Sequence, residues 1–354
     1  MKRIFSTLLS RSLVLACLSS AFVSCDAIYD DDLPPCTTET RLLFRYDYNM
    51  KYADAFPAEV NSLRIWAFDK QGRPVWSDTR SGAELQEKEF YITVPLEPGT
   101  YDFVAWCGLD GNEGSFSLLN PSPADISDLS VDMLLKGGSR ADDTPSLFSD
   151  AKFSGLYHVL RKDVVISRNP DANETHEVEL SLTKDTNYIK VLLQNLDGSE
   201  MKKDDFSIFI TADQAGFSHD NMVKQAPEVF RYEPWLVTSG ATSLPEGETS
   251  SEGTQTSVSS VLAELSTSRL MADARSYLTV VRNSDNQTII RVPFIQYLLL
   301  VKGNYRPMAD QEYLDRQDDY SLTFFIDKNY NWYSKIGIYI NSWHVVPQQD
   351  TPLQ

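Results

Sequence analysis

The chain has 354 residues, of which 42% are hydrophobic and 11% aromatic, values typical of a folded protein rather than a disordered one. Its 50 acidic and 32 basic residues give a formal net charge of −18, which argues against nucleic acid as a partner because like charges repel. The length is sufficient for two domains of ordinary size.

The first segment predicts a lipoprotein signal peptide over residues 1–24. Two basic residues follow the initiator methionine, and residues 12–24 are uncharged and too few to span a bilayer permanently. Ser24 before Cys25 resembles the lipobox of bacterial lipoproteins, in which a diacylglycerol is attached to the cysteine sulfur and the cysteine becomes the first mature residue. Phe22 stands where Leu is commoner. An ordinary signal peptide with a chance cysteine is the alternative.

Residues 25–39 are predicted to be an acidic, lipid-linked tether. Asp26 and the acidic run 30–32 resemble the surface-export signal of Bacteroidetes lipoproteins, and a merely solvated spacer is the alternative. Each buried CH₂ of an acyl chain such as palmitate contributes about 0.8 kcal/mol, so two or more chains make attachment effectively permanent. Loss of residues 1–24, which carry three basic and no acidic residues, moves the net charge from −18 to −21.

Four cysteines are present in the chain. Cys17 leaves with the signal peptide and Cys25 would carry the lipid, so Cys36 and Cys107 remain as a candidate disulfide in an exported protein. Closing that loop stabilises a fold by about 4 kcal/mol in the chain-entropy model. The alternative is two unpaired buried thiols. Neither cysteine has a nearby His or third Cys to complete a metal site.

Residues 40–186 are predicted to form an N-terminal β-sandwich, because short apolar runs alternate with turn residues. Glu97–Thr100 is expected to be a type II turn with Gly99 at positive φ. The helical spacing of Ile126, Leu129 and Met133 predicts a short helix. The strands are expected at 41–48, 61–69, 74–76, 90–96, 101–106, 162–167 and 177–183.

Residues 187–347 are predicted to form a C-terminal β-sandwich, with 348–354 as a tail. The boundary is placed near residues 184–187, and residues 239–257 are expected to be a flexible loop because they are rich in Ser, Thr, Gly and Glu. Short helices are expected at 293–301 and 310–316. The strands are expected at 188–196, 206–212, 257–265, 276–282, 288–292, 320–327 and 335–342, with 343–346 extending the last.

The sequence contains none of the common motifs that carry catalysis. No His-Glu-x-x-His or Gly-x-Ser-x-Gly is present, and the four histidines are expected to be surface or half-buried residues. The segment 327–331 begins like a calcium loop, but Trp332 stands where that loop needs Gly, so a turn is favoured. We therefore expect no catalytic, cofactor-binding or metal-binding residues.

Two further groups of side chains have competing interpretations. The acidic pairs Asp204–Asp205 and Asp318–Asp319 are expected to lie on the solvated surface rather than in a glycosidase cleft. Trp66, Trp76 and Trp106 could line a sugar platform, but their strand positions favour core packing.

Several blocks, taken in order, resemble the fimbrial anchor (minor fimbrial subunit) lipoproteins of Bacteroidetes, within the fimbrillin-like superfamily. The resemblance implies two tandem transthyretin-like β-sandwich domains, no catalytic residues, and a lipid-held subunit at the base of a pilus in the outer membrane that influences fimbrial assembly or length. Relatives polymerise by strand exchange, in which open sheet edges accept main-chain hydrogen bonds from fimbrial stalk subunits. The blocks are 25–33, 45–50 with 53–56, 98–101 with 104–106, 310–316, and 338–343 with 345–346.

A surface glycan-binding lipoprotein of a polysaccharide-uptake system is the alternative, because it would share the lipobox, the acidic tether and the β-rich body. Exposed co-planar aromatic side chains beside a cleft would favour the glycan-binding alternative. An open hydrophobic groove along a sheet edge would favour the anchor.

Overall fold

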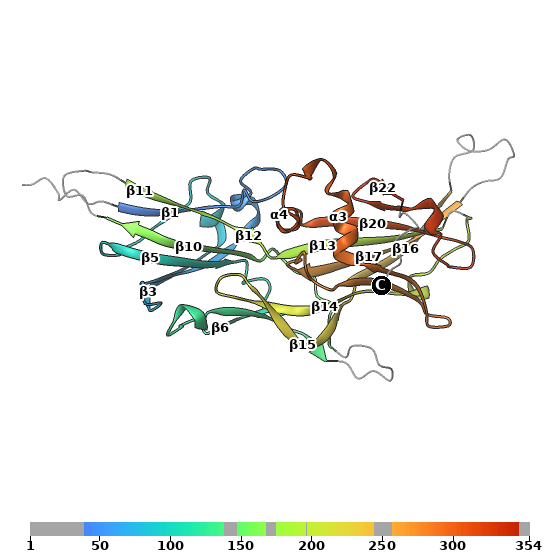
Figure 1. Cartoon of the computed structure of the whole chain (residues 1–354), viewed down its shortest axis with the longest axis horizontal. Helices are drawn as coiled ribbons and strands as arrows, with labels where there is room; N and C mark the ends of the chain where they lie inside the picture. The colour runs from blue at the N-terminus through green and yellow to red at the C-terminus, as the bar shows by residue number, and fades with distance from the viewer. Residues whose placement is uncertain (1–38, 138–146, 168–174, 196, 244–256, 347–354) are drawn as a thin grey trace, which may run out of the picture. The chain divides into compact units, whose positions relative to one another are not determined.

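The computed structural model describes residues 39–137, 147–167, 175–195, 197–243 and 257–346. Thr40–Ser167 and His176–Gln354 group into one compact unit. The fold is all-β, as the sequence predicted, with sheets packed face to face and a few short helices (Figure 1). The predicted boundary near residues 184–187 stays a proposal.

The N-terminal part contains two layers, of which the five-stranded one is antiparallel throughout. A three-stranded sheet has the order β11-β1-β4, and a five-stranded sheet has the order β12-β10-β5-β2-β3. Helix α2 (Phe56–Glu59) follows β1. The strands are β1 (Glu39–Arg45), β2 (Ser62–Phe68), β3 (Pro74–Ser81), β4 (Tyr91–Thr93), β5 (Gly99–Cys107), β10 (Tyr157–Ile166), β11 (Thr175–Ser181) and β12 (Thr183–Lys184).

The strand β2 of the five-stranded sheet is buried on both faces. Along β2, Leu63 and Ile65 pack into the core shared with the three-stranded sheet, whereas Trp66 and Phe68 pack into a second core that continues into the C-terminal part. A strand buried on both faces reads as continuously apolar rather than alternating. Trp66 and Trp106 are core residues, as predicted, and Trp76 is partly buried against the first core.

The C-terminal part contains two larger sheets, one of which also includes the strands β6 to β9 from residues 116–149. One has the order β16-β17-β13-β20-β21-β22, and the other has the order β19-β18-β14-β15-β9-β8, with β6 and β7 attached beside β14. The strands are β6 (Phe116–Leu119), β7 (Ser130–Met133), β8 (Lys136–Gly137), β9 (Leu147–Ser149), β13 (Thr186–Asn195), β14 (Phe206–Ser218), β15 (Val223–Tyr232), β16 (Leu236–Ser243), β17 (Ser257–Ser268), β18 (Tyr277–Arg282), β19 (Gln287–Pro293), β20 (Asp319–Ile326), β21 (Ile338–Ile340) and β22 (Trp343–Val345).

The two predicted C-terminal helices are confirmed as α3 (Phe294–Leu299), continued by a 3₁₀ segment, and α4 (Asp310–Arg316). The part of the predicted 239–257 loop that the structure describes belongs to β16 and β17. Among the described helices, none is long and apolar enough to cross a bilayer.

Three local predictions are wrong. Ile126–Asp128 is a single 3₁₀ turn and the next residues form β7, because Leu129, Val131 and Met133 alternate inward against β6 and β14. The last predicted strand is instead the hairpin β21–β22, which turns at two residues with positive φ, 341 and 342.

The predicted type II turn at Glu97–Thr100 is also absent. Gly99 has no positive φ and already pairs with Ile166 as the first residue of β5. The Tyr101 ring folds back over Gly99 and its hydroxyl donates a 2.9 Å hydrogen bond to the carbonyl of Glu97, so a Cβ at Gly99 would lie 2.9 Å from that hydroxyl oxygen. Gly99 therefore permits the close approach of the Tyr101 ring rather than a turn, and a Cβ here would displace that ring.

Candidate functional site

One edge of the five-stranded sheet is open along most of β10. On one side β10 pairs with β5 over its whole length, whereas on the other side β12 pairs only with Tyr157 and His158. Within the described part of the chain, residues 159–166 have no strand beyond them. An open strand edge presents unpaired N–H and C=O groups that can pair with another chain.

The open edge borders a groove of about 570 Å³ between β10 and β11. The strand β11 is an edge strand of the three-stranded sheet (Figure 1). Val159 and Val164 of β10 and Val178 of β11 line it, and each of these side chains is at least nine-tenths buried in the first core. Glu177 and Glu179 line it from β11 with exposed side chains. The groove thus combines an apolar floor with a polar rim.

A β-bulge interrupts the open edge. The register of β10 against β5 shifts between Arg161 and Val164, and Asp163 within the bulge has a φ of +60°. The Oδ1 atom of Asp102 accepts hydrogen bonds from the backbone N–H of Asp163 at 2.8 Å and from Lys70 Nζ at 3.1 Å, and Lys70 also contacts Asp163. These contacts hold the kink, which divides the edge into two short straight pieces.

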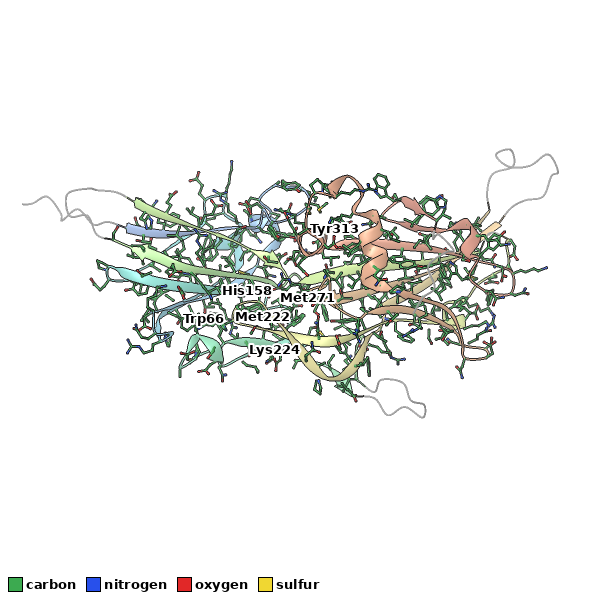
Figure 2. The ribbon with its side chains drawn as sticks, viewed as in Figure 1. Trp66, His158, Met222, Lys224, Met271 and Tyr313 are labelled. Carbon is green, nitrogen blue, oxygen red and sulfur yellow. The ribbon has the colours of Figure 1, made fainter. Side chains whose placement is uncertain are left out.

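The inner end of β10 is fixed by a buried histidine. His158 is 4% exposed, packs on Trp106 with ring centroids 4.5 Å apart, and has its Nε2 2.9 Å from the carbonyl oxygen of His219 (Figure 2 labels His158). Burial lowers the pKa of His158 to about 3, so the ring is neutral. The expectation that all four histidines are surface or half-buried residues is therefore wrong for His158.

The site residues predicted from sequence are only partly visible. Cys25 and Cys36 lie outside the described residues, so the lipid attachment and the disulfide stay predictions. Cys107 is fully buried in β5, where burial raises the pKa of its thiol. Within the described ranges, no group of three or more His, Cys, Asp and Glu side chains is arranged to hold a metal ion.

The acidic segments have structural roles. Asp327 caps its own turn, because its Oδ1 accepts the backbone N–H groups of Asn329 and Asn331 at 2.9 Å each. Asp318 is not a free surface acid, since its Oδ2 lies 2.5 Å from Lys184 Nζ. The Asp318 side chain is 33% exposed, so it is an ion-paired acid at the surface.

A family model described as "Fimbrillin-A associated anchor proteins Mfa1 and Mfa2" matches residues 33–349. The chain belongs to this family. It is a family of fimbrial anchors rather than of enzymes, and membership associates the chain with the fimbrium.

Solved structures agree with this membership. A candidate adhesin from Bacteroides thetaiotaomicron is 35% identical, with a TM-score of 0.72, and the match covers 89% of this chain and 99% of that one. A candidate polysaccharide-binding protein from the same organism is 24% identical, with a TM-score of 0.69 and the same coverage. Among the curated proteins compared, none matches this chain.

The fimbrial anchor protein Mfa2 from Porphyromonas gingivalis shares the fold of this chain. It is 16% identical, with a TM-score of 0.60, and the match covers 88% of this chain and 99% of that one. At that identity the similarity concerns the fold alone.

Sequence reasoning missed the open edge, although it identified residues 162–167 as a strand. The apolar residues of β10 show that the strand is buried on one face, but nothing in them shows which strand lies beside it. The only available signal was the polar run 161–163 inside an apolar stretch, which marks the bulge. By contrast, the structure brings together two of the blocks that carried the family resemblance, since the backbone N–H of Met50 donates to the carbonyl of Arg316 at 3.1 Å.

Proposed function

We propose that this anchor-family chain is the lipid-held base subunit of a fimbrium in the outer membrane, and that it holds the stalk by accepting a β-strand at the open edge of β10. Family membership supports the anchoring role. The observation that carries the strand-accepting role is that no strand among the described residues lies beyond 159–166, which border a groove with an apolar floor.

The length of the open edge suits a single extended segment. Its eight residues correspond to about 26 Å of strand at 3.3 Å per residue. Main-chain hydrogen bonds to β10 would supply affinity, and alternate apolar side chains of the incoming strand would pack on Val164 and Val178. The bulge at Asp163 would fix the register, because the incoming strand can pair with both pieces of the edge only if it carries a matching irregularity opposite the bulge.

Attachment to the membrane rests on Cys25. With two or more acyl chains on this cysteine, the protein would stay attached to the bilayer essentially permanently. We expect Cys25→Ala to release fimbriae into the medium, whereas Cys17→Ala, which alters a residue of the signal peptide, should leave fimbriae on the cell. Fimbriae that remain bound to cells expressing Cys25→Ala would contradict the anchoring role.

The strand-accepting edge is tested by photocrosslinking on intact cells. A photoreactive amino acid at Val165, which is 59% exposed and lines the groove, should crosslink to a stalk subunit. Val75 is the matched control, because it is a 45% exposed valine on β3 at the opposite edge of the same sheet. Equal crosslinking at both sites, or crosslinking at Val75 alone, would rule out the β10 edge as the acceptor.

A further inference from the structure

A polar cavity of about 480 Å³ lies where the loop after β1, the loop before β10, the β12–β13 segment and the end of α4 meet. Glu59 of α2 and Ser266 of β17 also line it. Its volume is within the range of ligand sites, roughly 300–1,000 Å³. The residues around it are mostly polar, and Met50 and Phe153 supply a small apolar area. The groove proposed to accept a strand shares no residue with this cavity.

The charges around the cavity balance. Three acidic and three basic residues line it, so their formal sum is zero. Lys184 Nζ lies between Glu59 Oε2 at 2.9 Å and Asp318 Oδ2 at 2.5 Å. The lining as a whole therefore favours neither an anion nor a cation, and a lipid would leave many of its polar groups without hydrogen bonds.

Two buried polar groups on the lining have unused hydrogen-bonding capacity. Tyr46 is 1% exposed, and no described residue forms a hydrogen bond with its hydroxyl. Asn187 is 7% exposed; its Nδ2 donates to the carbonyl of Ser268 at 3.0 Å, while its Oδ1 receives no hydrogen bond from the residues that the structure describes. Both residues line the cavity, so a ligand that enters it could use this hydrogen-bonding capacity.

The protonation state of Tyr46 makes it both a donor and an acceptor. Burial, followed by the nearby carboxylates of Asp318 and Glu59, raises the pKa of this phenol, which stays neutral at physiological pH. The Tyr46 ring itself is held edge-on against Tyr157 with centroids 5.0 Å apart. The hydroxyl is therefore presented from a rigid position, which lowers the entropy lost on binding.

We propose that this cavity binds a neutral oligosaccharide. The hydroxyl groups of a sugar donate and accept hydrogen bonds, which suits the neutral phenol of Tyr46, the free amide oxygen of Asn187 and a lining whose formal charges cancel. The C–H face of a sugar ring would pack on Met50 and Phe153. The anchor-family chain would thus contact a saccharide through residues on both sides of the predicted 184–187 boundary.

The test is saturation-transfer NMR and calorimetry on the full-length lipoprotein in detergent. The probes are the neutral trisaccharides maltotriose, cellotriose and triacetylchitotriose, with sialyllactose as the anionic comparison. At least one neutral probe is expected to bind with a Kd of about 1 mM or tighter. Absence of binding by all three neutral probes, or binding of sialyllactose alone, would overturn the proposal.

Matched variants assign the binding to the cavity. Tyr46→Phe removes only the hydroxyl and should weaken binding by about three- to tenfold, as expected for one lost hydrogen bond. Tyr320→Phe is the control, because Tyr320 is also fully buried with an unpartnered hydroxyl but does not line the cavity. Gln317→Ala should also weaken binding, whereas Gln71→Ala, in an exposed turn, should not. Affinity unchanged in both Tyr46→Phe and Gln317→Ala would refute the site.

Discussion

Arg269 donates two hydrogen bonds to the carboxylate of Asp315, from Nε to Oδ1 at 2.7 Å and from Nη2 to Oδ2 at 2.8 Å. The two side chains are 15% and 6% exposed, and Arg269 Nη1 also donates to the carbonyl of Asn221 at 2.9 Å. The fully buried carboxylate of Asp185 lies 4.0 Å from Arg269 Nε. One guanidinium therefore balances two buried acids that come from β12–β13 and α4.

Replacing this guanidinium should destabilise the fold strongly. Arg269→Met is expected to lower the free energy of unfolding by about 3–5 kcal/mol, because it leaves two buried carboxylates uncompensated. Urea denaturation at pH 7.5 measures the change. Lys136→Met is the control, since the side chains of Lys136 and its partner Asp150 are 60% and 38% exposed, and it should change stability by less than about 1 kcal/mol. Similar losses in both variants would contradict this account.

Asp185 should make stability fall as pH rises. Burial raises its pKa to about 7, although Arg269 and a hydrogen bond from Asn221 act in the opposite direction. Between about pH 4 and pH 7 the folded state therefore holds a proton that the unfolded state has lost, so this group removes up to about 1.4 kcal/mol of stability per pH unit. Relative to Asp185→Asn, the wild type should lose stability across that interval and show a constant difference above it.

His158 should act in the opposite direction. Its pKa in the folded state is about 3, below the value of about 6.5 expected in the unfolded chain, so unfolding takes up a proton between these values. Relative to His158→Phe, which keeps a ring against Trp106, the wild type should gain stability from about pH 3 to pH 6.5 and then level off. Urea titrations of both variants at several pH values measure the two slopes. Slopes of equal sign would refute one of the two assignments.

Two glycines with similar φ should differ sharply in tolerance to alanine. Gly108 has a φ of +79°, and a Cβ built there would lie 1.9 Å from the backbone oxygen of Gly155. Gly82 has a φ of +82° with nothing within 4 Å of its Cβ. Gly82→Ala is expected to cost about 1–2 kcal/mol from backbone strain alone, while Gly108→Ala should abolish soluble folded protein. Thermal unfolding of purified variants tests the contrast, which would fail if Gly108→Ala melted near Gly82→Ala.

The predicted Cys36–Cys107 bridge is tested by alkylation of the unfolded, unreduced lipoprotein. If the bridge forms, iodoacetamide should modify neither residue, and one crosslinked peptide pair should appear in the mass spectrum. Cys107→Ala should then free Cys36 for alkylation and lower stability by about 4 kcal/mol in the chain-entropy model. Modification of both thiols without reductant would show that Cys107 is only a buried thiol.

Much of the strand content could be predicted because apolar alternation is a local signal. In β11, Val178 and Leu180 face inward and Glu177 and Glu179 face outward, as the sequence indicated. The helix predicted from the spacing of Ile126, Leu129 and Met133 does not form. Residues 130–133 instead pair with β6 and β14, and this pairing outweighs the helical spacing of the apolar residues.

The candidate sites were less accessible to sequence reasoning, for a physical reason. An open edge is defined by the strand that is not beside it, and the cavity joins Tyr46 to Asn187 across more than a hundred residues of sequence. Local patterns contain neither relation. The family resemblance indicated strand exchange, but it did not locate the accepting edge.

The kink at Asp163 also bears on the proposal that the β10 edge accepts a strand. An uninterrupted ladder of eight residues would invite identical copies to fuse side by side into unwanted fibres. Because of the kink, the β10 edges of two subunits can pair over only a few residues, and such short pairings dissociate readily. A partner strand with a matching irregularity could pair along the whole edge. The bulge would therefore disfavour self-association and favour the proposed partner strand.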